Sequence, residues 1–198
     1  MELLLATANQ NKVRELEKML QGVSLQLKSL ADFPHYQAPP EDGESFLANA
    51  TCKAVAAAEH SGLLTLADDS GLQVDFLQGA PGVHSARYAG KEHDDKANNR
   101  KLLTALEGVP QEKRQAQFVC VVVVAAPNGQ FFYTQGSCKG EIAFSESGEG
   151  GFGYDPLFYL PNFGCSMAEL SASEKNRISH RGQALAQMVP LLKKVVED

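Results

Sequence analysis

The sequence has few cysteines, and their spacing fits none of the usual cysteine sites. No two of the four form a CxxC pair, and no neighbouring histidine completes a zinc-binding spacing. These absences argue against a zinc centre, and a chain of 198 residues needs no disulfide framework to fold. We interpret the cysteines as small buried hydrophobic residues, namely Cys52, Cys120, Cys138 and Cys165.

Long hydrophobic runs are also absent. The longest apolar run, Phe118 to Ala126, is about half of what a membrane span needs. The first residues, MELLLATANQNK, carry an acid where a secretory signal peptide needs a base, and their apolar run is too short for one. We therefore predict a soluble, cytoplasmic protein with no membrane partner.

Positive charge is scarce. Lysine and arginine number 18 against 24 aspartates and glutamates, which gives a formal net charge of −6. Long-range attraction to a nucleic-acid polymer or an anionic membrane would have the wrong sign, so we expect neither as a partner. A small anion could still bind where the few cations are concentrated.

Internal repeats and long linkers are missing as well, so we predict a single domain spanning residues 1–198. Helical and strand periodicities alternate along the first half of the chain, and Asn128-Gly129 then predicts an antiparallel hairpin. This order predicts an α/β fold with a mixed sheet flanked by helices. The predicted strands are 3–6, 25–28, 63–67, 72–76, 115–126, 130–136 and 157–160, and the predicted helices lie near 13–20, over 44–60, from 94 or 95 to 106, and from 179 onward.

A polar stretch follows the first predicted strand and opens the first helix. Backbone N–H groups at a helix N-terminus attract phosphate, so this turn is a candidate anion site. Alternatively, Thr7 or Asn9 merely caps the helix and Lys12 is solvated. The candidate residues are Thr7, Ala8, Asn9, Gln10, Asn11 and Lys12.

Two adjacent carboxylates, Asp68 and Asp69, stand where the strand at 63–67 is predicted to end, and Ser70 follows them. Ligand sites in α/β sheets lie beyond strand ends, and neighbouring side chains of an extended chain point opposite ways. One of the two carboxylates could therefore hold Mg²⁺ or accept a proton from water. Alternatively, both are solvated acids of an Asp-Gly turn.

The acidic stretch PPEDGE precedes the long helix at 44–60. Glu41 or Glu44 could supply a second oxygen ligand to Mg²⁺, which usually takes only one or two carboxylates from a protein. Lys53, within the helix, could reach a bound phosphate. Alternatively, these acids only favour the helix start and Lys53 is solvated.

A glycine-rich loop at 148–156 contains a formal GxGxxG pattern. Because Pro156 and an apolar strand follow it, it is not a dinucleotide fingerprint. Two aromatics in such a loop can stack on a base while an acid accepts from a base N–H, or the aromatics can simply be core residues. The candidate residues are Phe152, Gly153, Tyr154 and Asp155.

Near the last predicted helix, several basic residues gather in an otherwise acidic chain. Ser171 and Glu174 fit a capping box, so part of this segment is structural. Cations near a helix start oppose the helix dipole, and a bound anion or carbonyl would give them a role. The basic residues are Lys175, Arg177, His180 and Arg181.

Together these segments resemble the Ham1/inosine triphosphate pyrophosphatase family, most closely its bacterial members. The resemblance spans nearly the whole chain, through TANQNK, EDGESFLANA, ADDSGL, APGVHSARYAG, GGFGYDPLF and SEKNRISHRGQAL in that order. It implies a long bent sheet, two lobes with a central cleft, and usually a homodimer. It also implies Mg²⁺-dependent cleavage of ITP, dITP or XTP to the monophosphate and pyrophosphate.

The resemblance also implies residue roles. The turn from Thr7 to Lys12 would meet the triphosphate with Lys53 nearby, Glu41 and Asp69 would hold the metal, and Asp69 would also be the proton acceptor. Ser70 would contact substrate, the loop from Phe152 to Asp155 would bind the base, and Lys175, His180 and Arg181 would read its edge. Many members have glycine where this chain has Ala8, which matters only if the turn needs positive φ there. The alternatives are a non-hydrolytic purine nucleotide sensor and a Maf-type nucleotide pyrophosphatase with another base preference.

Overall fold

The computed structural model describes residues 1–91 and 94–197. The chain forms two compact units, each assembled from separate segments of the sequence. Unit 1 consists of Met1–Asp69, Cys120–Gly136 and Arg181–Asp198, and unit 2 consists of Ser70–Val119 and Ser137–His180.

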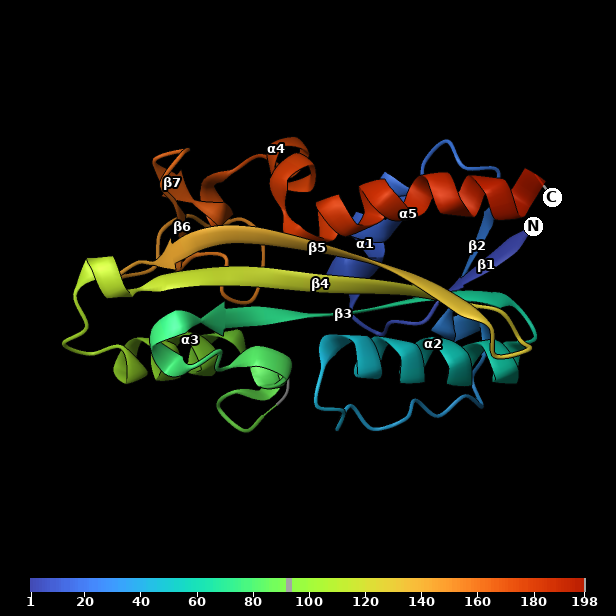
Figure 1. The fold of residues 1–198 in the computed structure, drawn as a ribbon, viewed down its shortest axis with the longest axis horizontal. Coiled ribbons are helices and arrows are strands. Elements are labelled where there is room, and N and C mark those ends of the chain that lie inside the picture. The colour runs from blue at the N-terminus through green and yellow to red at the C-terminus, as the bar shows by residue number, and fades with distance from the viewer. Residues whose placement is uncertain (92–93, 198) are drawn as a thin grey trace. The chain divides into compact units, whose positions relative to one another are not determined.

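A mixed seven-stranded sheet in the order β2-β1-β3-β4-β5-β6-β7 confirms the predicted fold class (Figure 1). Strand β1 pairs in parallel with β2 and β3, whereas β6 pairs antiparallel with β5 and β7. The strands are β1 (Glu2–Leu5), β2 (Gln26–Ser29), β3 (Leu64–Val74), β4 (Gln115–Ala125), β5 (Phe131–Ile142), β6 (Phe158–Leu160) and β7 (Cys165–Ser166).

Helices connect and flank these strands. Those that the structure describes are α1 (Gln10–Met19), α2 (Phe46–Ser61), α3 (Asp95–Ala105), α4 (Ala172–Ile178) and α5 (His180–Glu197). Short 3-10 helices occupy Leu30–Asp32, Asp75–Leu77, Gly82–Arg87, Gln111–Lys113 and Met167–Glu169. Within residues 1–91 and 94–197, we find no helix that combines the length and the apolar character needed to cross a membrane.

Unit 1 has helices on both faces of its strands. Helices α1 and α5 pack on one face, where alternate residues of β1, β3 and β4 point. Helix α2 contacts β1 and lies on the other side of these strands, with a buried stripe of alanines (Figure 1). The α1/α5 core contains Leu3, Leu5, Val13, Leu16, Leu20, Leu66, Cys120, Val122, Val124, Ala184, Leu185, Met188 and Leu192.

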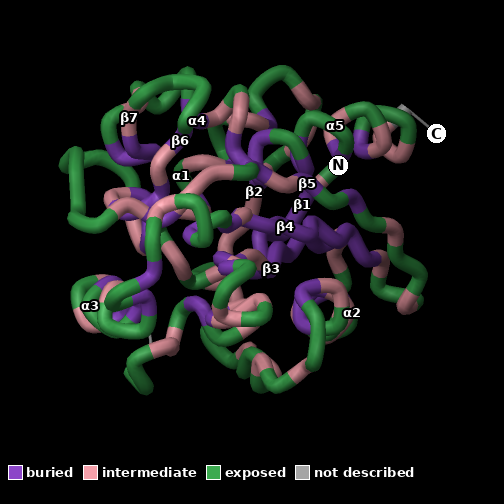
Figure 2. The backbone as a smooth tube through the Cα atoms, turned by 60° about the vertical axis from the view of Figure 1, so that its left-hand side comes forward, coloured by how far each residue is buried: buried purple, intermediate pink, exposed green. Residues whose placement is uncertain are grey.

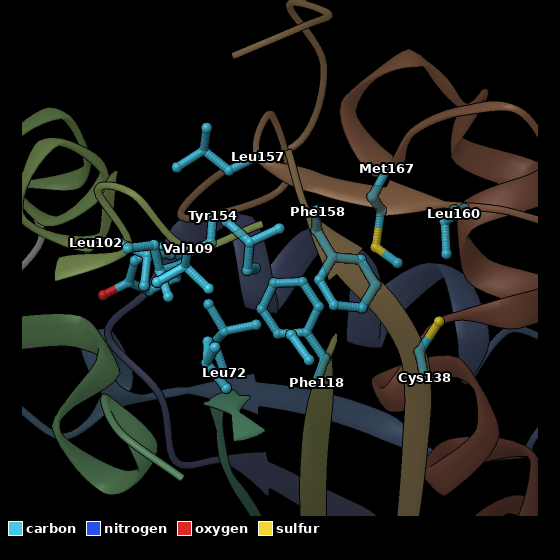
Figure 3. Packing of buried hydrophobic residues seen from close by; sticks show 14 residues of the cluster. Leu72, Leu102, Val109, Phe118, Cys138, Tyr154, Leu157, Phe158, Leu160 and Met167 are labelled. Carbon is cyan, nitrogen blue, oxygen red and sulfur yellow. The ribbon is translucent and has the colours of Figure 1, made fainter. Parts of the chain in front are cut away.

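Unit 2 has its own apolar core. The ring centroids of Phe118 and Phe158 are 4.6 Å apart, and Leu72 lies beside them (Figure 3). The cluster contains Leu72, Val74, Leu102, Leu106, Val109, Ala116, Phe118, Cys138, Ile142, Tyr154, Leu157, Phe158, Leu160 and Met167.

Strand β3 differs from its prediction. It runs without interruption through 68–71, where we expected an end, and its residues are mostly buried (Figure 2). The acidic residues stay in the strand because cations and an amide from α1, α2 and α5 contact their side chains. The two carboxylates therefore lie in the middle of a strand, not beyond its end.

Other predictions hold with changed bounds. Asn128-Gly129 forms the β4–β5 turn with Gly129 at φ 82°, but β5 continues to Ile142. Of the predicted strand at 72–76, residues 72–74 are the last part of β3, whereas 75 and 76 lie in the 3-10 helix Asp75–Leu77. The short strand β7 was not predicted. All four cysteines are free, yet Cys52 is exposed and Cys165 half-buried, so the expectation of burial is wrong for these two.

Candidate active site

In unit 1, Asp68 and Asp69 occupy consecutive positions on β3, so their side chains leave the strand on opposite faces. Asp68 contacts residues of α1 and α5, whereas Asp69 contacts residues of α2. This arrangement agrees with the expectation that the two carboxylates face different surroundings.

Asp68 is the centre of a buried ion-pair network. Its Oδ2 lies 3.0 Å from Lys12 Nζ and 3.2 Å from Arg181 Nη2, and Arg181 Nη1 lies 2.6 Å from Glu15 Oε2. Burial alone would raise the pKa of Asp68, but Lys12, Arg181 and Lys53 together hold that pKa well below its usual value. The carboxylate is therefore permanently charged and fixes the lysine and the arginine.

Asp69 has a different environment. Its Oδ2 accepts a hydrogen bond of 3.0 Å from Asn49 Nδ2, and its Oδ1 lies 3.8 Å from Lys53 Nζ. Lys53 Nζ also lies 3.0 Å from Glu41 Oε1. One lysine therefore contacts both carboxylates that were predicted as metal ligands.

Burial and the neighbouring charges together set the protonation of Asp69. Burial raises the pKa of the Asp69 carboxyl, although Lys53 and Lys12 oppose this shift. Burial also disfavours the charged form of Lys53, but Asp69, Asp68 and Glu41 outweigh it and raise the pKa of that lysine. Asp69 is thus the better proton acceptor of the two adjacent aspartates, beside a cation that stays charged.

Asn49 joins the loop before α2 to β3. Its Oδ1 accepts 2.8 Å from Gly43 N while its Nδ2 donates to Asp69. A Cβ at Gly43 would lie only 2.6 Å from Asn49 Oδ1, so this close approach requires glycine. The loop that carries Glu41 is thereby held next to Asp69.

The turn before α1 is both a cap and a source of charge. Asn9 is the N-cap residue and accepts from Asn11 N and Lys12 N, while Thr7 Oγ1 accepts from Asn9 N. The capping alternative is therefore confirmed for Asn9, but Lys12 is not solvated, because its side chain is mostly buried against Asp68.

Ala8 fits its position. Among residues 1–91 and 94–197, Gln78 is the only residue other than glycine with positive φ, so Ala8 adopts a conformation open to any L-residue. Gln10 and Asn11 are exposed in the first turn of α1, and Asn11 Oδ1 accepts from Arg14 Nη2 at 3.1 Å. Ser70 follows Asp69 on β3 and is half-buried.

In unit 2, the glycine-rich loop is organised by Asp155. Its Oδ2 accepts from Lys175 Nζ at 2.8 Å and from Phe152 N at 2.9 Å. The ammonium of Lys175 also lies 4.6 Å from the centre of the Phe152 ring. Three predicted residues from two separate motifs therefore lie together.

Tyr154 and His180 both contact buried groups of unit 2. Tyr154 is 4% exposed, its ring packs in the unit 2 core, and its hydroxyl donates to Ser85 O at 2.8 Å (Figure 3). The His180 ring stacks on Phe118 with 4.7 Å between centroids and 16° between planes. The core-aromatic alternative therefore describes Tyr154, whereas Phe152 is half-buried beside Lys175.

The basic residues were predicted to lie near the start of one final helix, but the structure divides them between two helices. Residues 172–178 form a separate helix, α4, with the predicted capping box at Ser171 and Glu174. Lys175 and Arg177 therefore lie in its last turn, where the helix dipole favours cations. Contrary to expectation, Lys175 and Arg177 do not oppose the dipole of the helix that carries them. Arg181 lies in unit 1 on the Asp68 network, whereas Lys175 and His180 lie in unit 2.

The donor set for a metal ion is small. In the part of the chain that the structure describes, no group of three or more His, Cys, Asp or Glu residues is arranged to hold a metal. Glu41 and Asp69 converge on Lys53 and offer two carboxylates, which suits Mg²⁺ because water and substrate oxygens usually complete its shell.

Two contacts of this region were missed in the sequence. Asn49 lies on the buried stripe of α2, where a polar residue among alanines signals a specific partner. Glu15 faces the same direction as Lys12 on α1, three residues away, but nothing in the sequence connects it to Arg181, 166 positions later.

The chain is similar to known proteins over nearly its whole length. A family model described as the Ham1 family matches residues 3–191. The dITP/XTP pyrophosphatase of Desulforamulus reducens is 53% identical over 195 residues, covering 98% of this chain and 97% of that protein. The dITP/XTP pyrophosphatase of Listeria monocytogenes is 48% identical over 196 residues, covering 99% and 97%. The structure of a HAM1 protein from Coxiella burnetii has a TM-score of 0.90 at 41% identity, covering 98% and 99%.

Proposed function

Because the chain belongs to the Ham1 family, we propose that it hydrolyses non-standard purine nucleoside triphosphates such as ITP, dITP and XTP to the monophosphate and pyrophosphate. The observation that carries the proposal is the cluster around Asp69, in which a proton-accepting carboxylate lies beside a charged lysine and a second carboxylate. Hydrolysis of a phosphoanhydride needs these elements: charge neutralisation, positioning and removal of a proton from water.

In this proposal, the triphosphate binds to unit 1. Lys12 and Lys53 supply positive charge, and the α1 N-terminus adds backbone N–H groups. Asp68 does not contact substrate. It keeps the Lys12 ammonium in place at the start of α1, because the carboxylate stays ionised at every working pH.

Glu41 and Asp69 would hold Mg²⁺. When bound, Mg²⁺ would neutralise phosphate charge and lower the pKa of a coordinated water. Lys53 would then give up part of its contact with these carboxylates and turn toward phosphate oxygens. Asp69 would accept the proton of the attacking water on a carboxylate oxygen, a role that its raised pKa supports.

The base would bind to unit 2, at the loop from Phe152 to Asp155. Hypoxanthine and xanthine carry an oxygen acceptor at position 6, where adenine carries an amino donor. Donors of unit 2, from Lys175, His180 or backbone N–H groups of the loop, would satisfy that oxygen. Against adenine, each such donor left unpaired would cost about 1–3 kcal/mol.

The test is pyrophosphate release from a panel of ITP, dITP, XTP, GTP, ATP and modified pyrimidine triphosphates, with and without Mg²⁺. We expect release from the first three. Tight binding of ITP without release would indicate a nucleotide sensor. A preference for modified pyrimidines would indicate a Maf-type activity instead.

Three further expectations belong to this proposal. We propose a homodimer, located in the cytoplasm, with neither nucleic-acid polymers nor membranes as partners. Sedimentation analysis tests the dimer, and cell fractionation tests the location.

A further inference from the structure

Helix α3 contacts the candidate base-binding loop through two side chains on one face. Asp95 and Asn99 are four positions apart, so they lie one above the other on the helix. Asp95 Oδ2 accepts from Gly153 N at 2.8 Å, and Asn99 Nδ2 donates to Gly153 O at 3.2 Å. The helix therefore engages both polar backbone groups of a single loop residue.

Asn99 uses its whole donor capacity in this region. Its amide nitrogen also donates to Glu146 Oε1 at 2.8 Å, two residues before the glycine-rich loop. The side chain is 3% exposed, and within residues 1–91 and 94–197 its Oδ1 accepts no hydrogen bond. A buried amide with an unsatisfied oxygen is unfavourable, and the two donated bonds offset that cost.

The loop needs such support from outside. Gly153 lies in a turn with φ +63°, a left-handed conformation, between the half-buried Phe152 and the buried Tyr154. Tyr154 is anchored in the core, and Asp155 is paired with Lys175. The Gly153 peptide links these two anchored residues to Phe152, so its orientation, together with the bond from Phe152 N to Asp155, sets where that ring lies.

We propose that Asp95 and Asn99 are positioning residues that fix the Gly153 peptide and thereby set the affinity and selectivity for the purine base. This inference rests on the proposed function, because it assigns the loop to base binding. The two residues do not touch the reacting phosphates. Their loss therefore affects substrate binding and discrimination, not the rate of the chemical step.

The sharpest variant is Asn99→Asp, which keeps size and shape but replaces both donated N–H groups by an oxygen that faces Gly153 O and Glu146. We expect KM for ITP to rise about tenfold and the ITP-to-ATP preference to narrow, with kcat changed by less than about twofold. Hydrogen–deuterium exchange of a peptide covering residues 150–156 should accelerate.

Asn98→Asp is the matched control. Asn98 is the preceding residue, is equally buried, and uses its amide on Ala89 N and Ala86 O, not on the glycine-rich loop. We expect this variant to leave hydrogen–deuterium exchange at 150–156 and the ITP-to-ATP preference at wild-type values. Equal changes in Asn98→Asp and Asn99→Asp would overturn the proposal.

Two rescue experiments separate positioning from a general loss of stability. In Asn99→Asp combined with Glu146→Gln, one hydrogen bond is restored with donor and acceptor exchanged, so part of the KM increase should be recovered. Asp95→Asn keeps an acceptor for Gly153 N and should retain wild-type KM, whereas Asp95→Ala should not. Asp95→Asn and Asp95→Ala also test the proposal if Asn99→Asp does not fold.

Unchanged KM, preference and exchange in Asn99→Asp and Asp95→Ala would refute the inference. So would a fall in kcat with unchanged KM. Failure of the proposed function is a distinct result: the wild type would then release no pyrophosphate from any nucleotide. In that case the exchange measurement alone decides whether α3 holds the loop.

Discussion

Asp68 and Asp69 are adjacent on β3, yet their surroundings shift their carboxyl pKa values in opposite directions. Burial is the largest influence on both. Two direct ion pairs overcome it at Asp68, whereas at Asp69 burial outweighs the opposing effects of Lys53, Lys12 and the Asn49 amide. The chain thus has one carboxylate fixed as a charge and one able to exchange a proton.

Asp69→Asn should separate activity from stability. We expect pyrophosphate release to fall by about 10²–10⁴-fold or more, because the proton acceptor is lost. The pKa of Asp69 is higher in the folded protein than in the unfolded chain. Above about pH 4, the ionised Asp69 carboxylate therefore destabilises the folded protein. The variant should therefore keep or increase the wild-type Tm in a neutral thermal melt. Near-normal turnover would remove Asp69 from the mechanism.

Asp68→Asn should have the opposite effect on stability. Lys12 and Arg181 would lose their shared counter-charge in a buried position, and we expect a loss on the order of 3 kcal/mol in the free energy of unfolding at pH 7.

The same pair has a defined pH dependence. The folded protein lowers the pKa of Asp68, so its contribution is complete above the unfolded value, near 4, and is lost as the pH falls toward the folded value. Urea titrations between pH 3 and 7 should show that the free energy of unfolding falls less at acid pH in Asp68→Asn than in the wild type. Parallel curves would contradict this account.

At the scale of elements, α2 connects the acidic loop before it to the middle of β3. Asn49 holds Gly43 with its oxygen and Asp69 with its nitrogen, so it orders a loop and tunes a carboxyl at once. Asn49→Asp would replace the donor with a second carboxylate facing Asp69. Like charges raise the pKa of one of the pair, so the acidic limb of the kcat/KM profile should move to higher pH. An unshifted limb would mean that Asp69 does not govern it.

Sequence patterns identified most elements but not the course of β3. Helix α1, the alanine stripe of α2 and the Asn128-Gly129 turn follow local rules, because periodicity and turn chemistry are local properties. The two successive aspartates, Asp68 and Asp69, predicted the end of a strand. They remain inside one because Lys12 and Arg181 come from positions 56 residues before and 113 residues after Asp68, and no local rule contains that information.

The candidate site was predictable to a similar degree. The residue types at 12, 53, 68, 69 and 155 indicated chemistry, and resemblance to a family assigned roles to most of them. The pairing of Lys175 with Asp155 and of Glu15 with Arg181 required the fold. So did the assignment of Tyr154 to the core, because a buried and a stacking aromatic look alike in a sequence.

At the scale of the whole molecule, a chain of net charge −6 must bind a polyanion if the proposal is correct. Its cations Lys12, Lys53 and Arg181 are each held by carboxylates, so much of their charge is already balanced. A divalent cation would therefore be needed to offset the phosphates, and Glu41 and Asp69 are the residues that would hold it.

Chelation should accordingly abolish pyrophosphate release without unfolding the protein. Packing in both units depends on apolar clusters and on ion pairs within the chain, so we expect the Tm to be unchanged in EDTA while activity is lost and then restored by Mg²⁺.

Glu41→Gln should raise the Mg²⁺ concentration for half-maximal activity, by about tenfold for the loss of one carboxylate ligand. Glu44→Gln is the matched control, since Glu44 is exposed in the same loop, and it should keep the wild-type Mg²⁺ requirement. Equal shifts in the two variants would remove Glu41 from the metal site, and full activity in EDTA would remove the metal from the reaction.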